Sequence, residues 1–152
     1  MRLFLVQHGE AKAEAEDPDR PLTERGREEA TRVANAARRL RLKPAIIYHS
    51  GKLRAKQTAE IFSAALQQPV EFAPGLNPND DIRPWNERAK RESEDIMLVG
   101  HLPFLDKLSA HLLAGYERAR MIFFRYAAII CLERREDQTW GIRWLLTPEM
   151  VL

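Results

Sequence analysis

The sequence predicts an α/β fold in which helices cover both faces of a central, mostly parallel β-sheet. Short apolar segments typical of buried strands alternate along most of the chain with segments whose apolar residues recur every three or four positions, as on one face of a helix. The last two apolar segments are separated only by the polar turn REDQ, so we expect them to pair antiparallel at the C-terminal end of the sheet. These patterns indicate a three-layer α/β/α architecture.

The first strand and the first helix have clear signals. Residues 2–6 form a continuous apolar run, which indicates a strand covered on both faces. Thr23 is a suitable N-cap residue for a helix that we expect to end near Pro44. The buried face of this helix is expected to carry Ala30, Val33, Ala34, Ala37 and Leu40.

The later elements continue the same alternation. Pro103 suits the first turn of a helix that stops at Gly115, where a residue without a side chain closes the helix easily. A polar, proline-rich loop with a short helix inside it is expected at 74–94. The other expected elements are strands at 45–49, 70–73, 95–100, 125–134 and 139–147 and a helix at 52–68.

The composition narrows the class of protein. A chain of 152 residues, 45% hydrophobic and 30% charged, is typical of a folded protein, and we expect one domain over residues 1–152. The 24 Lys and Arg nearly balance the 22 Asp and Glu, so the formal charge of +2 favours neither a nucleic-acid nor a membrane partner. The apolar run Leu3 to Val6 is too short for a signal sequence. The single cysteine, Cys131, indicates core packing in a reducing compartment, so we expect a cytoplasmic protein.

Polar residues follow three of the expected strands at the same edge of the sheet. The three strand ends read QHGE, HSGKLRAKQT and GHLP, and they contain His8, Arg54 and His101. Ligands of open α/β sheets bind beyond the carboxyl ends of the strands, so these three side chains are expected to lie together. Helix N-terminal amides and Arg54 would bind a tetrahedral anion, while one imidazole acts as nucleophile and the other donates to the anion.

Simpler interpretations apply to the histidines. A lone histidine at a strand end is commonly a satisfied polar cap, but two of them, each beside a glycine, favour a site. His49 and His111 lack this context and are expected to be structural. No carboxylate or cysteine falls at ligand spacing with these histidines, so we expect neither a metal nor another cofactor.

Four separated motifs then identify a family. LVQHGEA, DRPLTERG, SGKLRAKQTAE and LVGHLPFL occur in the order and approximate spacing of the histidine phosphatase superfamily, and the chain most resembles its small bacterial branch, the SixA-type phosphohistidine phosphatases. The resemblance implies a phosphoglycerate mutase-like fold, and the segment between Arg54 and His101 is too short for the large cap of some relatives. It also implies that His8 becomes transiently phosphorylated, that Arg54 and His101 bind the phosphoryl group, and that Arg20 is a further phosphate or substrate contact.

Gln7 departs from the family pattern, which usually has arginine before the nucleophile. Glutamine offers neutral hydrogen bonds but neither a charge nor a bidentate fork. The exchange should cost about 1 to 2 kcal/mol of transition-state stabilisation, or about ten- to thirtyfold in rate. Because Arg54, Arg20 and a protonated His101 remain as phosphate ligands beside Gln7, we expect a weakened but active phosphatase.

The substrate is argued from the leaving group. Cleaving an oxygen ester calls for an acid, and Asp80 and Asp81 in the 74–94 loop are the candidates. A phosphohistidine P–N bond needs less help because its leaving imidazole has a near-neutral pKa. This favours a phosphorylated protein, such as a histidine-containing phosphotransfer protein, as substrate. Two alternatives stay open: a phosphatase of small phosphate esters, and a weakly active or inactive relative that only binds phosphate or a phosphoprotein.

Overall fold

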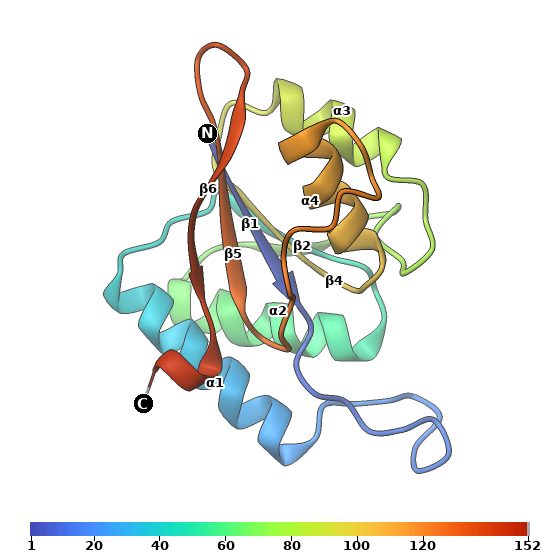
Figure 1. The fold of residues 1–152 in the computed structure, drawn as a ribbon. Helices are drawn as coiled ribbons and strands as arrows, with labels where there is room; N and C mark the ends of the chain where they lie inside the picture. The colour runs from blue at the N-terminus through green and yellow to red at the C-terminus, as the bar shows by residue number, and fades with distance from the viewer. Residues whose placement is uncertain (152) are drawn as a thin grey trace.

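A six-stranded sheet with helices on both faces forms the body of the molecule (Figure 1). The structure is a computed structural model and describes residues 1–151. The strands are β1 (Arg2–Gln7), β2 (Ile46–His49), β3 (Val70–Phe72), β4 (Ile96–Gly100), β5 (Ile129–Arg134) and β6 (Trp140–Leu146), in the spatial order β3-β2-β4-β1-β5-β6. The first four are parallel, while β5 runs antiparallel to both β1 and β6. The predicted fold class is therefore confirmed.

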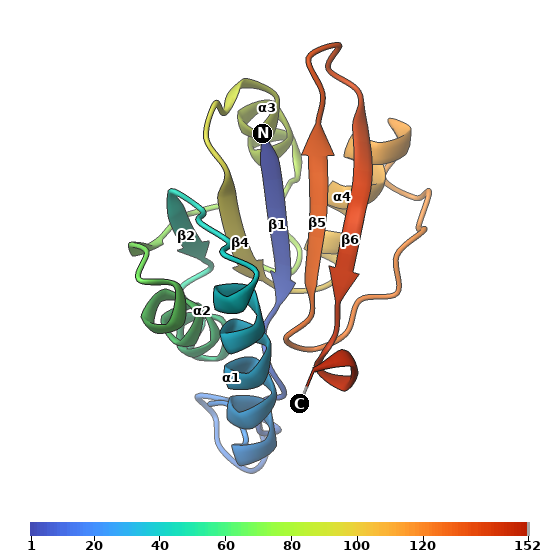
Figure 2. The same ribbon diagram turned by 90° about the vertical axis from the view of Figure 1, so that its left-hand side faces the viewer.

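Two helices cover each face of the sheet. In Figure 2, α1 lies in front of the strands and α4 lies behind them. The helices are α1 (Glu24–Arg39), α2 (Leu53–Leu66), α3 (Arg83–Arg91) and α4 (Phe104–Ala114), followed near the end of the chain by a short 3₁₀ helix, η1 (Pro148–Met150). Within residues 1–151, no helix is long and apolar enough to cross a membrane.

Strand β1 is buried on both faces, as its sequence predicts. Phe4 and Val6 belong to the core cluster beneath α1 and α2, whereas Leu3 and Leu5 belong to the cluster beneath α3 and α4. Successive side chains of a strand point to opposite faces, so a continuous apolar run fills both cores. Cys131 on the neighbouring β5 is fully buried, and burial raises the pKa of its thiol to about 11, which fits the predicted packing role.

The helix ends agree with the sequence in part. The Thr23 hydroxyl accepts a hydrogen bond from the Gly26 amide at 2.9 Å and so caps α1, and Gly115 closes α4 in the left-handed conformation with φ of 73°. The predicted end of the first helix near Pro44 is wrong, because α1 stops at Arg39. Leu40 is then the C-cap and is 57% exposed, not part of the buried face.

The last two strands pair as predicted, but β5 begins later than residue 125. The Ala128 amide donates to the Arg125 carbonyl at 3.1 Å, and Ala127 has a positive φ of 62°. These residues form a turn, which no hydrophobic pattern signals, before the strand begins.

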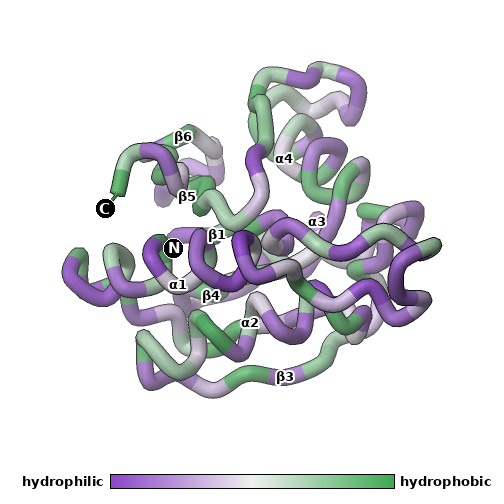
Figure 3. The backbone as a smooth tube through the Cα atoms, turned by 90° about the horizontal axis from the view of Figure 1, so that it is seen from below, coloured by the Kyte–Doolittle hydropathy of each residue, from purple (hydrophilic) through white to green (hydrophobic). Residues whose placement is uncertain are grey.

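The carboxyl ends of β1, β2 and β4 meet at the lower end of the sheet in Figure 1. Figure 3 views this end, and its colouring changes between green and purple along the helices, as expected when one side of a helix packs and the other faces water. The loops that follow the three strands therefore lie together, and α2 and α4 begin beside them.

Candidate active site

His8 and His101 lie side by side at this end of the sheet. β1 and β4 are neighbours with Gln7 opposite Gly100, so the residue that follows each strand is a histidine. The His8 amide donates to the Gly100 carbonyl at 3.0 Å, and the two ring centroids are 5.0 Å apart. Both side chains are buried. The structure thus brings together the two histidines that the strand-end pattern singled out.

The proton on the His8 ring is fixed by its own loop. Nδ1 lies 2.7 Å from the Gly9 carbonyl oxygen, which can only accept, so Nδ1 carries the proton and Nε2 keeps its lone pair. Burial, together with the positive charges of Arg54 and Arg20, lowers the pKa of His8 to about 4. At neutral pH this ring is uncharged and presents one free nitrogen, which is the state a nucleophile requires.

His101 is oriented by Ser50 at the end of β2. The Ser50 hydroxyl lies 2.6 Å from His101 Nε2 and also accepts from the Lys52 amide at 3.3 Å. Nε2 is the one acceptor that the hydroxyl hydrogen has within residues 1–151, so we assign this hydrogen to the bond with Nε2. The ring proton of His101 is then on Nδ1, which is buried and has no partner within residues 1–151. Ser50 therefore makes His101 a donor beside His8.

His101 is neutral in the protein alone, contrary to the expectation of a protonated ring. Burial comes first among the causes that lower its pKa to about 3, followed by the charge that His8 gains in acid and by the positive charges of Arg54, Lys52 and Arg20. A phosphoryl dianion beside the ring would favour the charged form again.

Arg54 enters the site from the first turn of α2. Its charge lowers the pKa of both His8 and His101, and its own pKa is lowered by burial and by Arg20. Its Nε is buried without a partner among the described residues. Two donors, Arg54 Nε and His101 Nδ1, are thus left unpaired around His8. An anion with several oxygens would satisfy both.

Thr58 and Gly26 hold the loop that follows His8. The Thr58 hydroxyl accepts from the Gly9 amide at 2.9 Å and donates to the Arg54 carbonyl at 2.8 Å, which joins the loop to α2. On the other side, a Cβ added at Gly26 in α1 would lie 2.1 Å from the carbonyl oxygen of Glu10. The loop therefore packs directly on the backbone of α1.

Arg20 and Gln7, the other predicted phosphate ligands, both lie near the histidines. Arg20 has a positive φ of 49°, and its Nε donates to the Lys12 carbonyl at 3.0 Å while its charge still reaches His8 and His101. Gln7 is half-buried at the end of β1, and its carbonyl accepts from the Ala127 amide at 2.9 Å. Its side chain makes no hydrogen bond within the part of the chain that the structure describes.

The structure argues against Asp81 as the proton donor. The Arg83 side chain donates to Asp81 at 2.8 Å and lowers the pKa of this carboxyl, which is therefore ionised at neutral pH. Asp80 accepts from the Asn77 amide at 2.9 Å within its own loop. Neither aspartate has a hydrogen bond to His8, Arg54 or His101 in residues 1–151.

Tyr126 belongs to the site, although no pattern in the sequence points to it. Its ring centroid is 5.5 Å from that of His8, and the ring is 37% exposed at the edge of the site. Tyr126 lies in the turn before β5, where no motif or periodicity marks it. The contacts of Thr58 and Ser50 were also missed, although both residues fall inside the quoted SGKLRAKQTAE motif.

The neutral, buried histidines should make the protein less stable in acid. An unfolded histidine titrates near 6.5, whereas folded His8 does so at about 4 and His101 at about 3. The unfolded chain binds more protons between these values, so stability that is complete above pH 6.5 falls as the pH drops toward 4 and 3. Denaturant unfolding should show that His8 accounts for about 3 kcal/mol of this loss.

The matched variant for this measurement is His8→Asn, whose amide can still donate to the Gly9 carbonyl but does not titrate. Subtracting the free energy of unfolding of His8→Asn from that of wild type at each pH removes the contribution that the carboxylates make to both proteins. If the free energies of unfolding of wild type and His8→Asn fell in parallel as the pH dropped, His8 would not be buried in its neutral form.

The comparisons with known proteins agree with this geometry. The model of the histidine phosphatase superfamily (branch 1) matches residues 3–80, a range that includes His8, Arg20 and Arg54. An uncharacterized protein from Picosynechococcus sp. is 38% identical over 113 residues, which are 69% of this chain and 68% of that protein.

Solved structures match over nearly the whole chain. The protein histidine phosphatase SixA complexed with tungstate has a TM-score of 0.86 at 27% identity, covering 97% of each chain. The α-ribazole phosphatase from Shigella flexneri has a TM-score of 0.76 at 18% identity, with 97% of each chain covered. The phosphoserine phosphatase from Entamoeba histolytica has a TM-score of 0.74 at 18% identity, with 99% of each covered. The last two likenesses concern the fold alone.

Proposed function

Because the chain belongs to the histidine phosphatase superfamily, branch 1, we propose that it is a phosphatase whose nucleophile is His8 and whose substrate is phosphohistidine on a protein. One observation carries the proposal. His8 has its Nδ1 proton fixed on the Gly9 carbonyl and its Nε2 free, next to two buried donors that lack partners, Arg54 Nε and His101 Nδ1. A nucleophile surrounded by unpaired donors is suited to receive a phosphoryl group.

In the first step, the lone pair of His8 Nε2 attacks phosphorus. The substrate ring reacts with a proton on its other nitrogen, so when the bond between phosphorus and the substrate nitrogen breaks, the electron pair stays on a neutral imidazole. Arg54 and His101 donate to the equatorial oxygens, where charge is spread in the transition state. Because His8 Nδ1 keeps its proton on the Gly9 carbonyl, the phosphorylated ring is a cation.

In the second step, water attacks the phosphorus of phosphorylated His8. The Nε2–P bond breaks, its electron pair returns to Nε2, and a water proton leaves to solvent or to the phosphate released. The positive charge on the phosphorylated ring makes Nε2 a good leaving group, so this step needs no carboxylic acid. The cycle ends with neutral His8 restored.

The choice of substrate follows from the proton donor. Arg83 lowers the pKa of Asp81, and neither Asp80 nor Asp81 has a hydrogen bond to His8, Arg54 or His101 within residues 1–151. Neither candidate acid is therefore in place for an alkoxide leaving group. An imidazole leaves without such help because its pKa is near neutral. SixA, which resembles this chain at 27% identity, is a protein histidine phosphatase. A phosphorylated histidine-containing phosphotransfer protein is accordingly the kind of partner that we propose.

The rival function is phosphate or phosphoprotein binding without turnover, which the loss of a guanidinium at Gln7 favours. One experiment separates the two. The protein is incubated with a phosphotransfer protein carrying radiolabelled phosphohistidine, and in parallel with a phosphoserine protein and p-nitrophenyl phosphate. We expect phosphate release from phosphohistidine to be faster than release from either ester, and rapid quenching should find acid-labile label on His8. Faster hydrolysis of either ester would favour an ester phosphatase, and vanadate binding without any release would favour the binder.

Gln7→Arg should raise the rate about tenfold, because it restores a charged donor among the phosphate ligands. The measurement is the initial rate of phosphate release, together with vanadate affinity. Gln138→Arg is the matched control, since it adds the same charge in the exposed turn between β5 and β6. A lower rate with an unchanged circular dichroism spectrum would show that other groups already fill the place of the guanidinium.

A further inference from the structure

Three exposed apolar residues lie in the connection that ends beside His8. They are Met121, Phe123 and Tyr126, which are 56%, 99% and 37% exposed, and we call these three residues the apolar rim. Single exposed apolar residues are ordinary, but a group of them beside a reactive site is typical of a surface that another molecule covers. All three lie in the connection between α4 and β5.

The direction of Phe123 is fixed by its neighbours. Ile122 is 7% exposed and belongs to the core cluster beneath α3 and α4, and Phe124 packs against the same cluster. Exposed Met121 and Phe123 therefore alternate with buried Ile122 and half-buried Phe124. Ile122 and Phe124 attach this segment to the core, and the side chain of Phe123 faces solvent.

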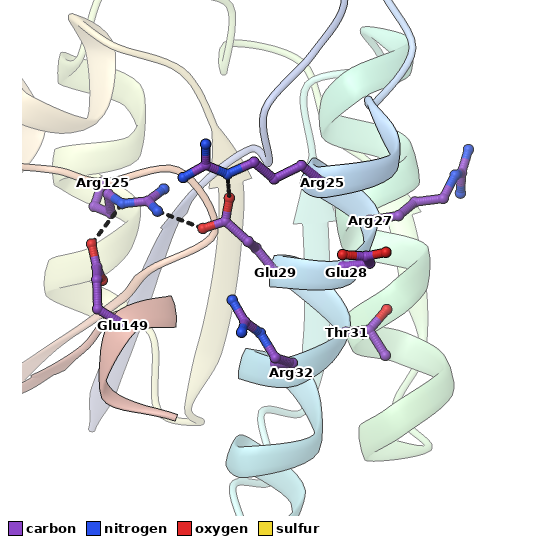
Figure 4. A pocket seen from close by; sticks show the side chains of 8 residues that line it. All are labelled: Arg25, Arg27, Glu28, Glu29, Thr31, Arg32, Arg125 and Glu149. Atoms are coloured by element: carbon purple, nitrogen blue, oxygen red, sulfur yellow. Dashed lines mark hydrogen bonds and ion pairs between the residues drawn. The ribbon is translucent and has the colours of Figure 1, made fainter. Parts of the chain in front are cut away.

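The end of the segment is anchored by Arg125. Figure 4 shows its guanidinium between Glu29 of α1 and Glu149 of η1, with donor–acceptor distances of 2.5 and 2.7 Å. Glu29 is buried and also accepts from Arg25 at 3.0 Å. Several charges paired at a buried carboxylate hold the backbone next to Tyr126 in place.

The apolar rim reaches the candidate active site through Tyr126. The Tyr126 ring lies 5.5 Å from that of His8, and the Ala127 amide donates to the Gln7 carbonyl at 2.9 Å. In Figure 2 the connection descends on the side of β6, and its last turn before β5 reaches the end of β1. A histidine side chain is short, so a protein that delivers phosphohistidine to His8 must bring its own backbone close to this rim.

The charges at the pocket indicate what else the partner carries. Arg20, Lys52 and Arg54 all place positive charge around His101, and Arg118 is exposed in the same connection as the rim. A partner surface that is acidic around its phosphohistidine would complement them. A small phosphate ester bound at His8 would leave Phe123 exposed to solvent, whereas a protein substrate can cover it.

We propose that the apolar rim of Met121, Phe123 and Tyr126 docks the phosphoprotein substrate, through an apolar side chain that the partner presents beside its phosphohistidine within an acidic surface. This inference rests on the proposed phosphohistidine phosphatase function and adds the surface that selects proteins over small phosphoramidates. Phe123 is the anchor of the rim, since aromatic residues that become buried on binding supply much of the energy of such contacts.

The test compares Phe123→Ser with wild type on two substrates that both break a P–N bond. One is a histidine-phosphorylated phosphotransfer protein with an acidic surface, and the other is phosphoramidate, which has no protein surface. We expect KM for the protein to rise about tenfold in Phe123→Ser, with kcat changed less than about twofold. Phosphoramidate hydrolysis should stay within about twofold of wild type. Phe123→Leu, which keeps an apolar side chain, should recover most of the affinity.

Leu40→Ser is the matched control, because Leu40 is 57% exposed at the C-terminal end of α1, away from the catalytic end. Leu40→Ser should change neither KM for the phosphoprotein nor the rate of phosphoramidate hydrolysis. An unchanged KM for the phosphoprotein in Phe123→Ser would overturn the docking surface, and so would an equal loss on both substrates. A dimer in sedimentation that dissociates in Phe123→Ser would overturn it in favour of a second copy of this chain. If wild type hydrolyses neither substrate, the proposed function fails and the docking surface fails with it.

Discussion

His8→Ala is expected to reduce phosphate release from a phosphohistidine protein by at least about 1,000-fold, because the variant lacks the nitrogen that accepts the phosphoryl group. The same holds for His8→Asn, whose amide can replace the Nδ1 donor to the Gly9 carbonyl but supplies no nucleophile. The measurement is single-turnover phosphate release with rapid quenching. The acid-labile label on the protein should vanish in both variants.

The matched control is His111→Ala, since His111 is a half-exposed histidine of α4 outside the pocket. It should retain wild-type rates. Retained turnover in His8→Asn, or label transferred to His101 at a normal rate, would show that His8 is not the nucleophile. Thermal unfolding of each variant separates a chemical loss from a folding defect.

Arg54→Ala is expected to weaken the binding of phosphate and vanadate about 100-fold, or about 3 kcal/mol. Arg54 is the guanidinium whose Nε is buried without a partner among the described residues, whereas the nearby Arg20 already donates from its own Nε to the Lys12 carbonyl. Titration calorimetry with orthovanadate measures the loss. Arg54→Lys should recover only part of the affinity, because an ammonium group cannot form the two parallel hydrogen bonds of a guanidinium.

Arg27→Ala provides the control for lost positive charge, since Arg27 is exposed on α1. Its vanadate affinity should equal that of wild type. If Arg54→Ala bound vanadate as tightly as wild type, Arg54 would point away from the anion and the proposed first step would lose its main electrostatic stabilisation.

The meeting of His8 and His101 could be predicted because it depends on a simple rule. Parallel strands end at the same edge, so residues that follow neighbouring strands come together whatever the rest of the chain does. The Thr23 cap was predictable for a similar reason, since it depends on residues within one turn. Local chemistry of this kind also explains Asp81, whose partner Arg83 is two positions away and could have been found from the sequence.

The missing parts of the prediction are contacts between distant segments. Tyr126 reaches His8 only because a turn before β5 crosses the end of β1, and no periodicity encodes that crossing. The neutral state of His101 in the protein alone results from burial and from charges that several loops contribute, and no local sequence pattern encodes either cause. The roles of Gln7 and Arg20 stay predictions, since the structure shows where they lie but not what they bind.

The contact of Gly26 with the loop after His8 limits how this chemistry can be moved to another protein. The helix lies so near that even a methyl group at this position would meet the Glu10 carbonyl. Transplanting the histidines and arginines onto a new scaffold would therefore fail unless a helix with a bare backbone at that point came with them. For a protein engineer, the part of the site that carries His8 can be moved only as β1, the loop and the first turn of α1 together.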